Sequence, residues 1–156
     1  MRSCRYPLVI HHGLPAAKYV SAAREEVMNT MKLLTKKLQK KIPPLYSQEE
    51  SADPLIVCKF FLPGSGWTWY VIEGSTRERD GCGWGTNCHH LPLTEYDPNR
   101  DDVLFFGWVD GIEPEFGYFS LSELESIRGI LGLRVERDRS FKPRRLSEAK
   151  RETNLV

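Results

Sequence analysis

Two cysteines and two histidines lie within nine residues of the sequence, at Cys82, Cys88, His89 and His90. Thiolate sulfur and imidazole nitrogen are the ligands that Zn²⁺ prefers in tetrahedral sites, so these four residues are candidate metal ligands. Their spacing differs from zinc signatures, in which paired ligands stand about two to four residues apart at both ends. Adjacent histidines also do not readily reach one ion. We therefore interpret the segment as an exposed loop and predict no metal or other cofactor.

Three carboxylates, Asp110, Glu113 and Glu115, lie in a turn between two aromatic segments. Neighbouring carboxylates move each other's pKa values apart, as acid and base catalysis requires, so these residues are candidate catalytic groups. No histidine, lysine or serine partner can be identified nearby in the sequence. A nucleophile elbow of the Gly-x-Ser-x-Gly type and a phosphate-binding Gly-x-x-x-x-Gly-Lys loop are also missing. A solvated turn is the preferred interpretation, and an enzyme is not favoured.

Four aromatic residues, Trp67, Trp69, Tyr70 and Trp108, have the side chains of a platform for stacking nucleobases. Such platforms need lysine or arginine around them, whereas residues 51–125 hold 4 Lys and Arg against 13 Asp and Glu, a net charge of −9. Core packing is therefore the preferred role for most of these rings. Candidate binding residues for a partner are Trp67, Trp69, Trp108 and Glu115.

The net charge of +1 over 156 residues hides an uneven distribution. Residues 1–50 carry 9 basic against 4 acidic residues, and residues 126–156 again carry 9 against 4, so two positive ends flank the negative middle. A concentrated negative field steers association with a basic partner. The two positive ends either bind phosphate groups or form a solvent-exposed helix face and a solvent-exposed tail. Their basic residues include Lys36, Lys37, Lys40, Lys41, Lys142, Arg144, Arg145, Lys150 and Arg151.

Apolar runs in this sequence are short. None approaches the roughly 18 residues of a membrane span, so we predict no membrane insertion. His11 and His12 interrupt the run that follows Pro7, which leaves it shorter than the core of a signal peptide. Four irregularly spaced cysteines do not form a disulfide framework. We therefore expect a reducing, cytoplasmic location.

The sequence allows two interpretations of where the N-terminal helix begins. In the first, residues 16–42 form one amphipathic helix that ends at Pro43 and Pro44. In the second, Thr35 caps a short helix over residues 36–42, and everything before Met31 is an extension. Hydrophobic periodicity fits both.

Strand signals follow in pairs. Residues 55–62 and 67–72 predict a hairpin joined by Pro63–Gly66, and residues 103–109 and 116–119 predict a second pair joined at Asp110-Gly111. Alternating residues 133–138 indicate a fifth, edge strand. Between the pairs, residues 74–102 read as a long surface loop.

A short helix is predicted after the second pair of strands, because the spacing of apolar residues becomes helical from Ser120 onward. Either Ser120 with Glu123 or Ser122 with Glu125 has the spacing of a capping box. The inward stripe comprises Leu121, Leu124, Ile127 and Leu131. We expect a single α+β domain with a mainly antiparallel sheet of four to five strands, an N-terminal helix and this capped helix.

A set of short motifs follows in order along the chain: Leu45–Glu49, Phe60-Phe61, Trp67–Tyr70, Phe105–Gly107, Glu115–Leu124, Val135–Asp138 and Phe141–Pro143. These motifs resemble the DUF2958 family. This family comprises small uncharacterised proteins, mostly encoded on bacterial plasmids, integrative elements and phages and often near antirestriction genes. The resemblance covers about residues 31–148 and implies a domain over 31–148, with residues 1–30 as an extension or an upstream start and 149–156 as a basic tail. The stretch from Arg77 to Pro98 departs from the family pattern.

The preferred functional hypothesis is a non-enzymatic accessory protein of a mobile element, with a possible anti-defence role, that binds a protein with a basic surface through its acidic central region. One alternative is a small hydrolase or nucleic-acid-processing enzyme that uses Asp110, Glu113 or Glu115 near Trp67 and Trp108. Another is nucleic-acid binding by the basic ends. Carboxylates that converge in a concave pocket favour the enzyme, and carboxylates spread over an exposed surface favour binding.

Overall fold

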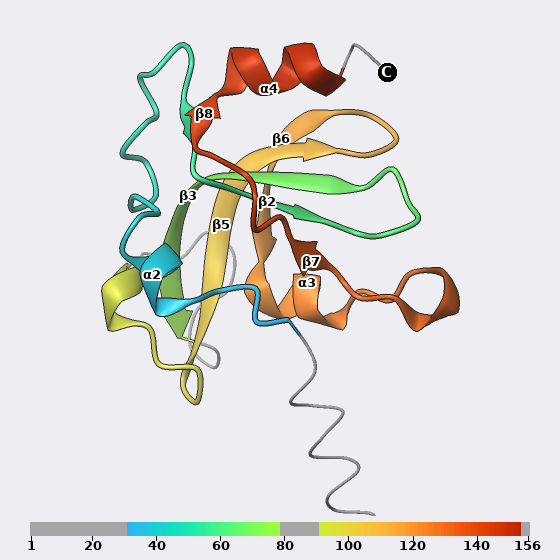
Figure 1. The fold of residues 1–156 in the computed structure, drawn as a ribbon. Coiled ribbons are helices and arrows are strands. Elements are labelled where there is room, and N and C mark those ends of the chain that lie inside the picture. The colour runs from blue at the N-terminus through green and yellow to red at the C-terminus, as the bar shows by residue number, and fades with distance from the viewer. Residues whose placement is uncertain (1–30, 79–90, 154–156) are drawn as a thin grey trace, which may run out of the picture. The chain divides into compact units, whose positions relative to one another are not determined.

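A mainly antiparallel, six-stranded sheet forms the centre of the fold, in the order β6-β5-β3-β2-β7 with β4 paired to β3 (Figure 1). The computed structural model describes residues 31–78 and 91–153. The chain divides into two compact units, Met1–Met31 and Lys32–Val156, and all of the described secondary structure belongs to the second. The six strands are β2 (Cys58–Phe61), β3 (Thr68–Glu78), β4 (Leu91–Pro92), β5 (Asp101–Asp110), β6 (Glu115–Ser120) and β7 (Glu136–Arg137).

A second, two-stranded sheet pairs β1 (Leu55–Ile56) with β8 (Arg144–Arg145). The α+β class and the antiparallel sheet are therefore confirmed, but the prediction of four to five strands is wrong. Residues 55–62, predicted as one strand, divide at Val57 between the two sheets. The predicted edge strand shrinks to β7, which pairs with β2.

The remaining additional strand comes from the segment that the sequence indicated as loop. Residues 74–78 extend β3, residues 101–102 begin β5, and β4 pairs with β3. Ser75, Thr76, Asp101 and Asp102 in these stretches are polar and yet buried. Their polar atoms have partners: Ser75 Oγ accepts a hydrogen bond from Leu45 N at 3.1 Å, and Thr76 Oγ1 donates to Leu91 O at 3.3 Å. A pattern of hydrophobicity does not reveal strands whose buried side chains are hydrogen-bonded polar groups.

The first described helix, α2 (Lys36–Gln39), begins where Thr35 Oγ1 accepts a hydrogen bond from Leu38 N at 3.4 Å. Residues 31–35 are not helical, so a continuous helix over 16–42 is wrong, and residues 16–30 lie outside the described residues. The Thr35-capped alternative holds, although its helix ends at Gln39 rather than at residue 42.

Helix α3 (Leu121–Ser126) has a complete capping box at Ser120. Glu123 N donates to Ser120 Oγ at 3.1 Å, and Ser120 N donates to Glu123 Oε2 at 2.7 Å. The predicted inward position of Leu131 is wrong: the chain leaves the helix early, and Leu131 is 94% exposed at a positive φ of 60°. It lies in the short 3-10 turn η2 (Ile130–Gly132).

Two clusters cover the two faces of the sheet. The larger packs α2 and α3 against the first face, around Phe60, Phe105 and Phe119. The smaller places Leu146 and Ala149 of α4 (Leu146–Thr153) against Tyr70 and Ile72 on the second face. A 3-10 turn, η1 (Leu93–Glu95), adds Leu93 to the larger cluster.

Cys58 lies within the larger cluster with 4% of its surface exposed, and this burial raises the pKa of its thiol from 9.0 to about 12. Since the folded state holds the proton to higher pH than the unfolded state, this contribution to stability is intact below pH 9.0 and is lost as pH rises toward about 12. We expect the free energy of unfolding to fall by about 2–3 kcal/mol less in Cys58→Val than in the parent when the pH is raised from 8 to 11. Urea unfolding at pH 8 and pH 11 measures this difference, and parallel losses in the two proteins would contradict it.

Candidate functional site

A β-bulge in β3 directs two consecutive side chains to the second face of the sheet. Val71 pairs with Gly107 and Glu73 pairs with Phe106 of β5, so Ile72 is the extra residue. Ile72 packs with Tyr70 in the second-face cluster, and Glu73 stands opposite Phe106 on the same face. A regular strand alternates its faces, so only the bulge brings a buried carboxylate next to this apolar patch.

A pocket of about 370 Å³ opens on this face, between the sheet and the segment that leads from α2 to β1. Its floor is aromatic. Phe106 and Phe116 stack with ring centroids 5.8 Å apart, and Phe106 and Tyr118 are tilted at 5.0 Å. Its rim carries the acidic and hydroxyl groups of the segment. We call this the acidic aromatic pocket, and its defining residues are Tyr46, Glu49, Glu73, Phe106, Phe116 and Tyr118.

Glu73 holds the rim in place. Its Oε2 accepts a hydrogen bond from Tyr46 N at 2.7 Å, and its Oε1 accepts from Gln48 N and, at 3.3 Å, from Ser47 Oγ. Tyr46 adopts a positive φ of 68°, which turns successive amides toward one carboxylate. The carboxylate is therefore buried, with 3% of its surface exposed, but well supplied with donors.

The pocket has a negative electrostatic character. Burial, a hydrogen bond with Tyr46 and the nearby charges of Glu73 and Glu49 raise the pKa of Tyr118 to about 12. The Tyr118 hydroxyl thus stays protonated at neutral pH. A cation in the pocket would lie near the exposed carboxylate of Glu49, the buried charge of Glu73 and several aromatic rings, which is the setting that favours ammonium and guanidinium groups.

The same aromatic surface already carries an ammonium group from within the chain. Lys150 of α4 places its Nζ 3.5 Å from the centroid of the Trp108 ring and 5.4 Å from that of Phe116. Trp108 meets Phe116 edge-on at 5.0 Å. Phe116 therefore contacts two rings with different roles: Trp108 binds the Lys150 ammonium, and Phe106 forms the floor of the acidic aromatic pocket.

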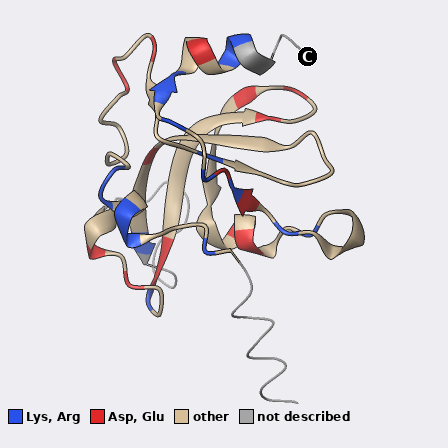
Figure 2. Cartoon of the chain, in the orientation of Figure 1, with Lys and Arg blue, Asp and Glu red and all other residues tan. Residues whose placement is uncertain are grey.

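The predicted carboxylates lie elsewhere. Asp110 ends β5, Glu113 lies in the turn and Glu115 begins β6; Glu113 and Glu115 are exposed, and none of the three is a lining residue of the acidic aromatic pocket. Figure 2 shows acidic residues gathered at the turn between β5 and β6.

The three predicted tryptophans divide between the faces of the sheet. Trp69 is buried in the first-face cluster, and Trp67 stacks on it at 6.0 Å with 40% of its surface exposed. Trp108 packs against the second-face cluster. Only Trp108 adjoins the acidic aromatic pocket, through Phe116.

Several acidic residues of the negative middle are engaged by groups of the chain itself, and Asp101 and Asp102 are buried. Asp102 accepts hydrogen bonds from Ser122 Oγ at 2.5 Å and Ser122 N at 3.1 Å. Asp53 accepts from Ser147 N at 2.9 Å and Ser147 Oγ at 2.8 Å at the start of α4, and these bonds lower the pKa of Asp53. Asp101 pairs with Arg100 at 2.9 Å. The negative charge available to a partner is correspondingly smaller than the sequence total.

The candidate metal ligands Cys82, Cys88, His89 and His90 lie outside the described residues. Within residues 31–78 and 91–153, no cluster of three or more His, Cys, Asp or Glu side chains has the arrangement of a metal site. In the same part of the chain, no helix is long and apolar enough to cross a membrane.

Sequence reasoning missed most of the acidic aromatic pocket, including Tyr46, Glu49 and Glu73. One signal was available: Phe106 and Trp108 alternate on β5, and Phe116 and Tyr118 alternate on β6. Two aromatic pairs with a period of two on neighbouring strands share a face.

Part of the chain matches one family model. The model of DUF2958, described as a protein of unknown function, matches residues 82–151. This match supports the family assignment that the sequence motifs predicted, and it spans the described elements from β4 to the body of α4. No curated protein and no solved structure matches the chain.

Proposed function

We propose that the protein is a non-enzymatic binding module that receives a lysine or arginine side chain of a partner protein in the acidic aromatic pocket. The observation that carries this proposal is the combination of stacked rings with the Glu49 and Glu73 carboxylates in one cavity of about 370 Å³. Lys150 on the adjoining Trp108 ring is an example within the chain of the same chemistry. A partner with a basic surface fits this pocket by charge.

The setting that we propose for this binding is the cytoplasm of a bacterium carrying a mobile element, where the protein is an accessory factor of a plasmid or phage with an anti-defence role. The family resemblance supports this setting. The hydrolase alternative lacks comparable support, because Asp110, Glu113 and Glu115 line none of the three pockets described here for residues 31–78 and 91–153. Clustered carboxylates at an exposed turn are common without catalysis.

Peptides that carry a single basic side chain test the proposal. We expect the full-length protein to bind a short arginine or lysine peptide more tightly than the same peptide with citrulline or norleucine, which are neutral replacements. Glu49→Gln and Phe116→Ala should each weaken binding about fivefold to tenfold, because they remove a carboxylate and a ring face. Fluorescence anisotropy of labelled peptides measures the affinities.

Glu113→Gln is the matched control, since it removes the same charge at the β5–β6 turn. We expect it to bind as the parent does. Equal affinity for the citrulline peptide, or an equal loss in Glu113→Gln and Glu49→Gln, would show that the pocket does not recognise a cation.

A further inference from the structure

Two adjoining pockets along the β2 edge of the sheet form a groove lined mainly by basic side chains. They have volumes of about 580 Å³ and about 270 Å³, and they share Arg137, Asp138 and Arg139. We call them together the basic groove. Its charged lining residues are Lys37, Lys41, Lys59, Arg137, Asp138 and Arg139, five basic against one acidic.

The fold assembles this groove from parts of the chain that are about 100 residues apart. Strand β7 pairs with the edge of β2, where Arg137 faces Phe60. The Arg137 guanidinium then donates to Leu33 O and to Thr35 Oγ1, both at 3.2 Å, across a sequence separation of 104 residues for Leu33. The two basic ends of the sequence thereby meet on one side of the sheet. Figure 2 shows basic residues on α2, which borders this region.

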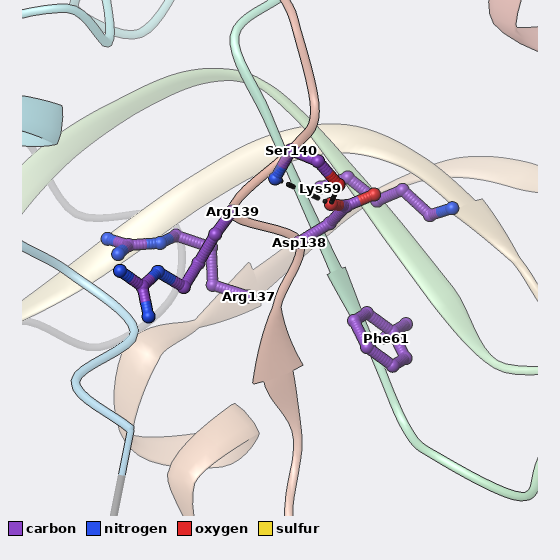
Figure 3. Close-up of a pocket in the computed structure, with 6 residues that line it drawn as sticks. All are labelled: Lys59, Phe61, Arg137, Asp138, Arg139 and Ser140. Atoms are coloured by element: carbon purple, nitrogen blue, oxygen red, sulfur yellow. Dashed lines mark hydrogen bonds between the residues drawn. The ribbon is translucent and has the colours of Figure 1, made fainter.

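The one carboxylate in the groove is held by its own turn. Asp138 Oδ1 accepts hydrogen bonds from Ser140 Oγ at 2.7 Å, Ser140 N at 2.9 Å and Phe141 N at 3.1 Å. Partial burial opposes ionisation of Asp138, but these bonds and the charge of Lys59 hold its pKa below the usual range. Figure 3 shows Arg137 and Arg139 on one side of Asp138 and Lys59 on the other. The excess of positive charge thus extends along the groove on both sides of Asp138.

Aromatic rings accompany the charges. Phe61 lines the larger pocket and is half-buried, and Phe141 lines the smaller. Grooves that bind single-stranded nucleic acid without sequence preference combine basic side chains that follow the phosphates with aromatic faces on which bases stack. A site for one free phosphate needs neither two adjoining pockets nor a half-buried ring such as Phe61 in its lining.

We propose that the basic groove binds single-stranded nucleic acid, with Arg139, Lys59, Lys37 and Lys41 on successive phosphates and Phe61 against a base. This site is independent of the acidic aromatic pocket, because none of its lining residues is shared. It also differs from binding by the extreme ends of the chain, since residues 35–41, 57–61 and 137–143 line it.

Anisotropy of a labelled oligothymidylate of about 12 nucleotides, bound to the full-length protein, tests this inference. We expect Lys59→Gln/Arg139→Gln to weaken binding at least about tenfold in about 50 mM salt, and to reduce the slope of log affinity against log salt by about 0.7 for each lost phosphate contact. Phe61→Leu should weaken binding about fivefold without changing this slope, because stacking releases no counterions. Arg134→Gln, at an exposed position outside both pockets, should bind as the parent does.

Failure of the parent to bind at about 50 mM salt would overturn the proposal. So would an equal loss in Arg134→Gln and Arg139→Gln, which would indicate a diffuse charge effect. Equal affinity for a duplex of the same length, or full displacement by the same concentration of inorganic phosphate, would also contradict a single-strand site. A failure here leaves the peptide-binding result unchanged, because the two sets of variants have no residue in common.

Discussion

Gly107→Ala is expected to prevent the protein from reaching its native fold. A Cβ atom on Gly107 would overlap the carbonyl oxygen of Tyr70 and would lie 2.9 Å from the Tyr70 carbonyl carbon and 3.2 Å from Val71 Cα. All three are backbone atoms of β3, the strand that pairs with β5 at the centre of the sheet. Relief requires separation of the two strands, and we expect a loss of more than about 4 kcal/mol, comparable with the whole stability of many domains.

Gly117→Ala is the matched control for this substitution. Gly117 of β6 is paired with Gly107, but a Cβ there would meet only Val109 Cγ2, at 4.0 Å. Because alanine restricts the unfolded chain more than glycine, Gly117→Ala should be neutral or stabilising by about 0.5 kcal/mol. Circular dichroism and urea unfolding of both variants measure the difference. A Gly107→Ala protein as stable as Gly117→Ala would refute the close approach of β3 and β5.

Glu73→Ala is expected to cost about 3 kcal/mol and to release the rim of the acidic aromatic pocket. The substitution removes the carboxylate that accepts from Tyr46 N and Gln48 N, and it leaves Ser47 Oγ with its bond to Pro44 O alone. It also removes a buried side chain beside Phe106. Urea unfolding measures the stability, and a glutamate-specific protease should cleave faster at Glu49 and Glu50 once the rim is released.

Glu115→Ala serves as the comparison, because it removes an exposed carboxylate from a strand of the same sheet. We expect its stability to stay within about 0.5 kcal/mol of the parent and its rate of cleavage at Glu49 to be unchanged. Similar losses in the two variants would mean that Glu73 has no special role in holding the rim. Unchanged peptide binding by Glu73→Ala would count against the proposed function.

The two proposed sites have opposite charges and lie on different parts of one sheet. The acidic aromatic pocket lies on the face of β3, β5 and β6 that α4 partly covers, and the basic groove lies along β2 and β7. Two oppositely charged sites in one small domain weaken each other's attraction for their ligands when they lie close together. Here the two sites have no lining residue in common, and their lining strands occupy different ends of the sheet order.

Much of the fold follows from local signals in the sequence. Branched and aromatic residues predict the centres of β2, β3, β5 and β6, and the spacing of Ser120 and Glu123 predicts the start of α3. Thr35 marks the start of α2 in one of two alternatives. These elements were predictable because their side chains contact neighbours close in sequence or alternate between core and solvent.

The remaining elements depend on partners far away in sequence. The polar continuations of β3 and β5 are strands because Ser75 meets Leu45 and Asp102 meets Ser122. The two residues of β7 form a strand because the edge of β2 is available to them. No local pattern contains this information, and so the sequence predicted too few strands.

By itself, the sequence determined the α+β class and the alternation of positive ends with a negative middle, and it predicted the resemblance to DUF2958. The tertiary structure decided what those charges do. Glu73 and Asp102 are buried hydrogen-bond acceptors and Asp53 accepts hydrogen bonds at the start of α4, so the negative middle is not one surface. Pairing of β7 with β2 joins the two positive ends into one groove. The charge of each residue can be counted along the sequence. A binding site, however, requires several charged side chains to lie close together in space, and contacts between distant parts of the chain bring them together.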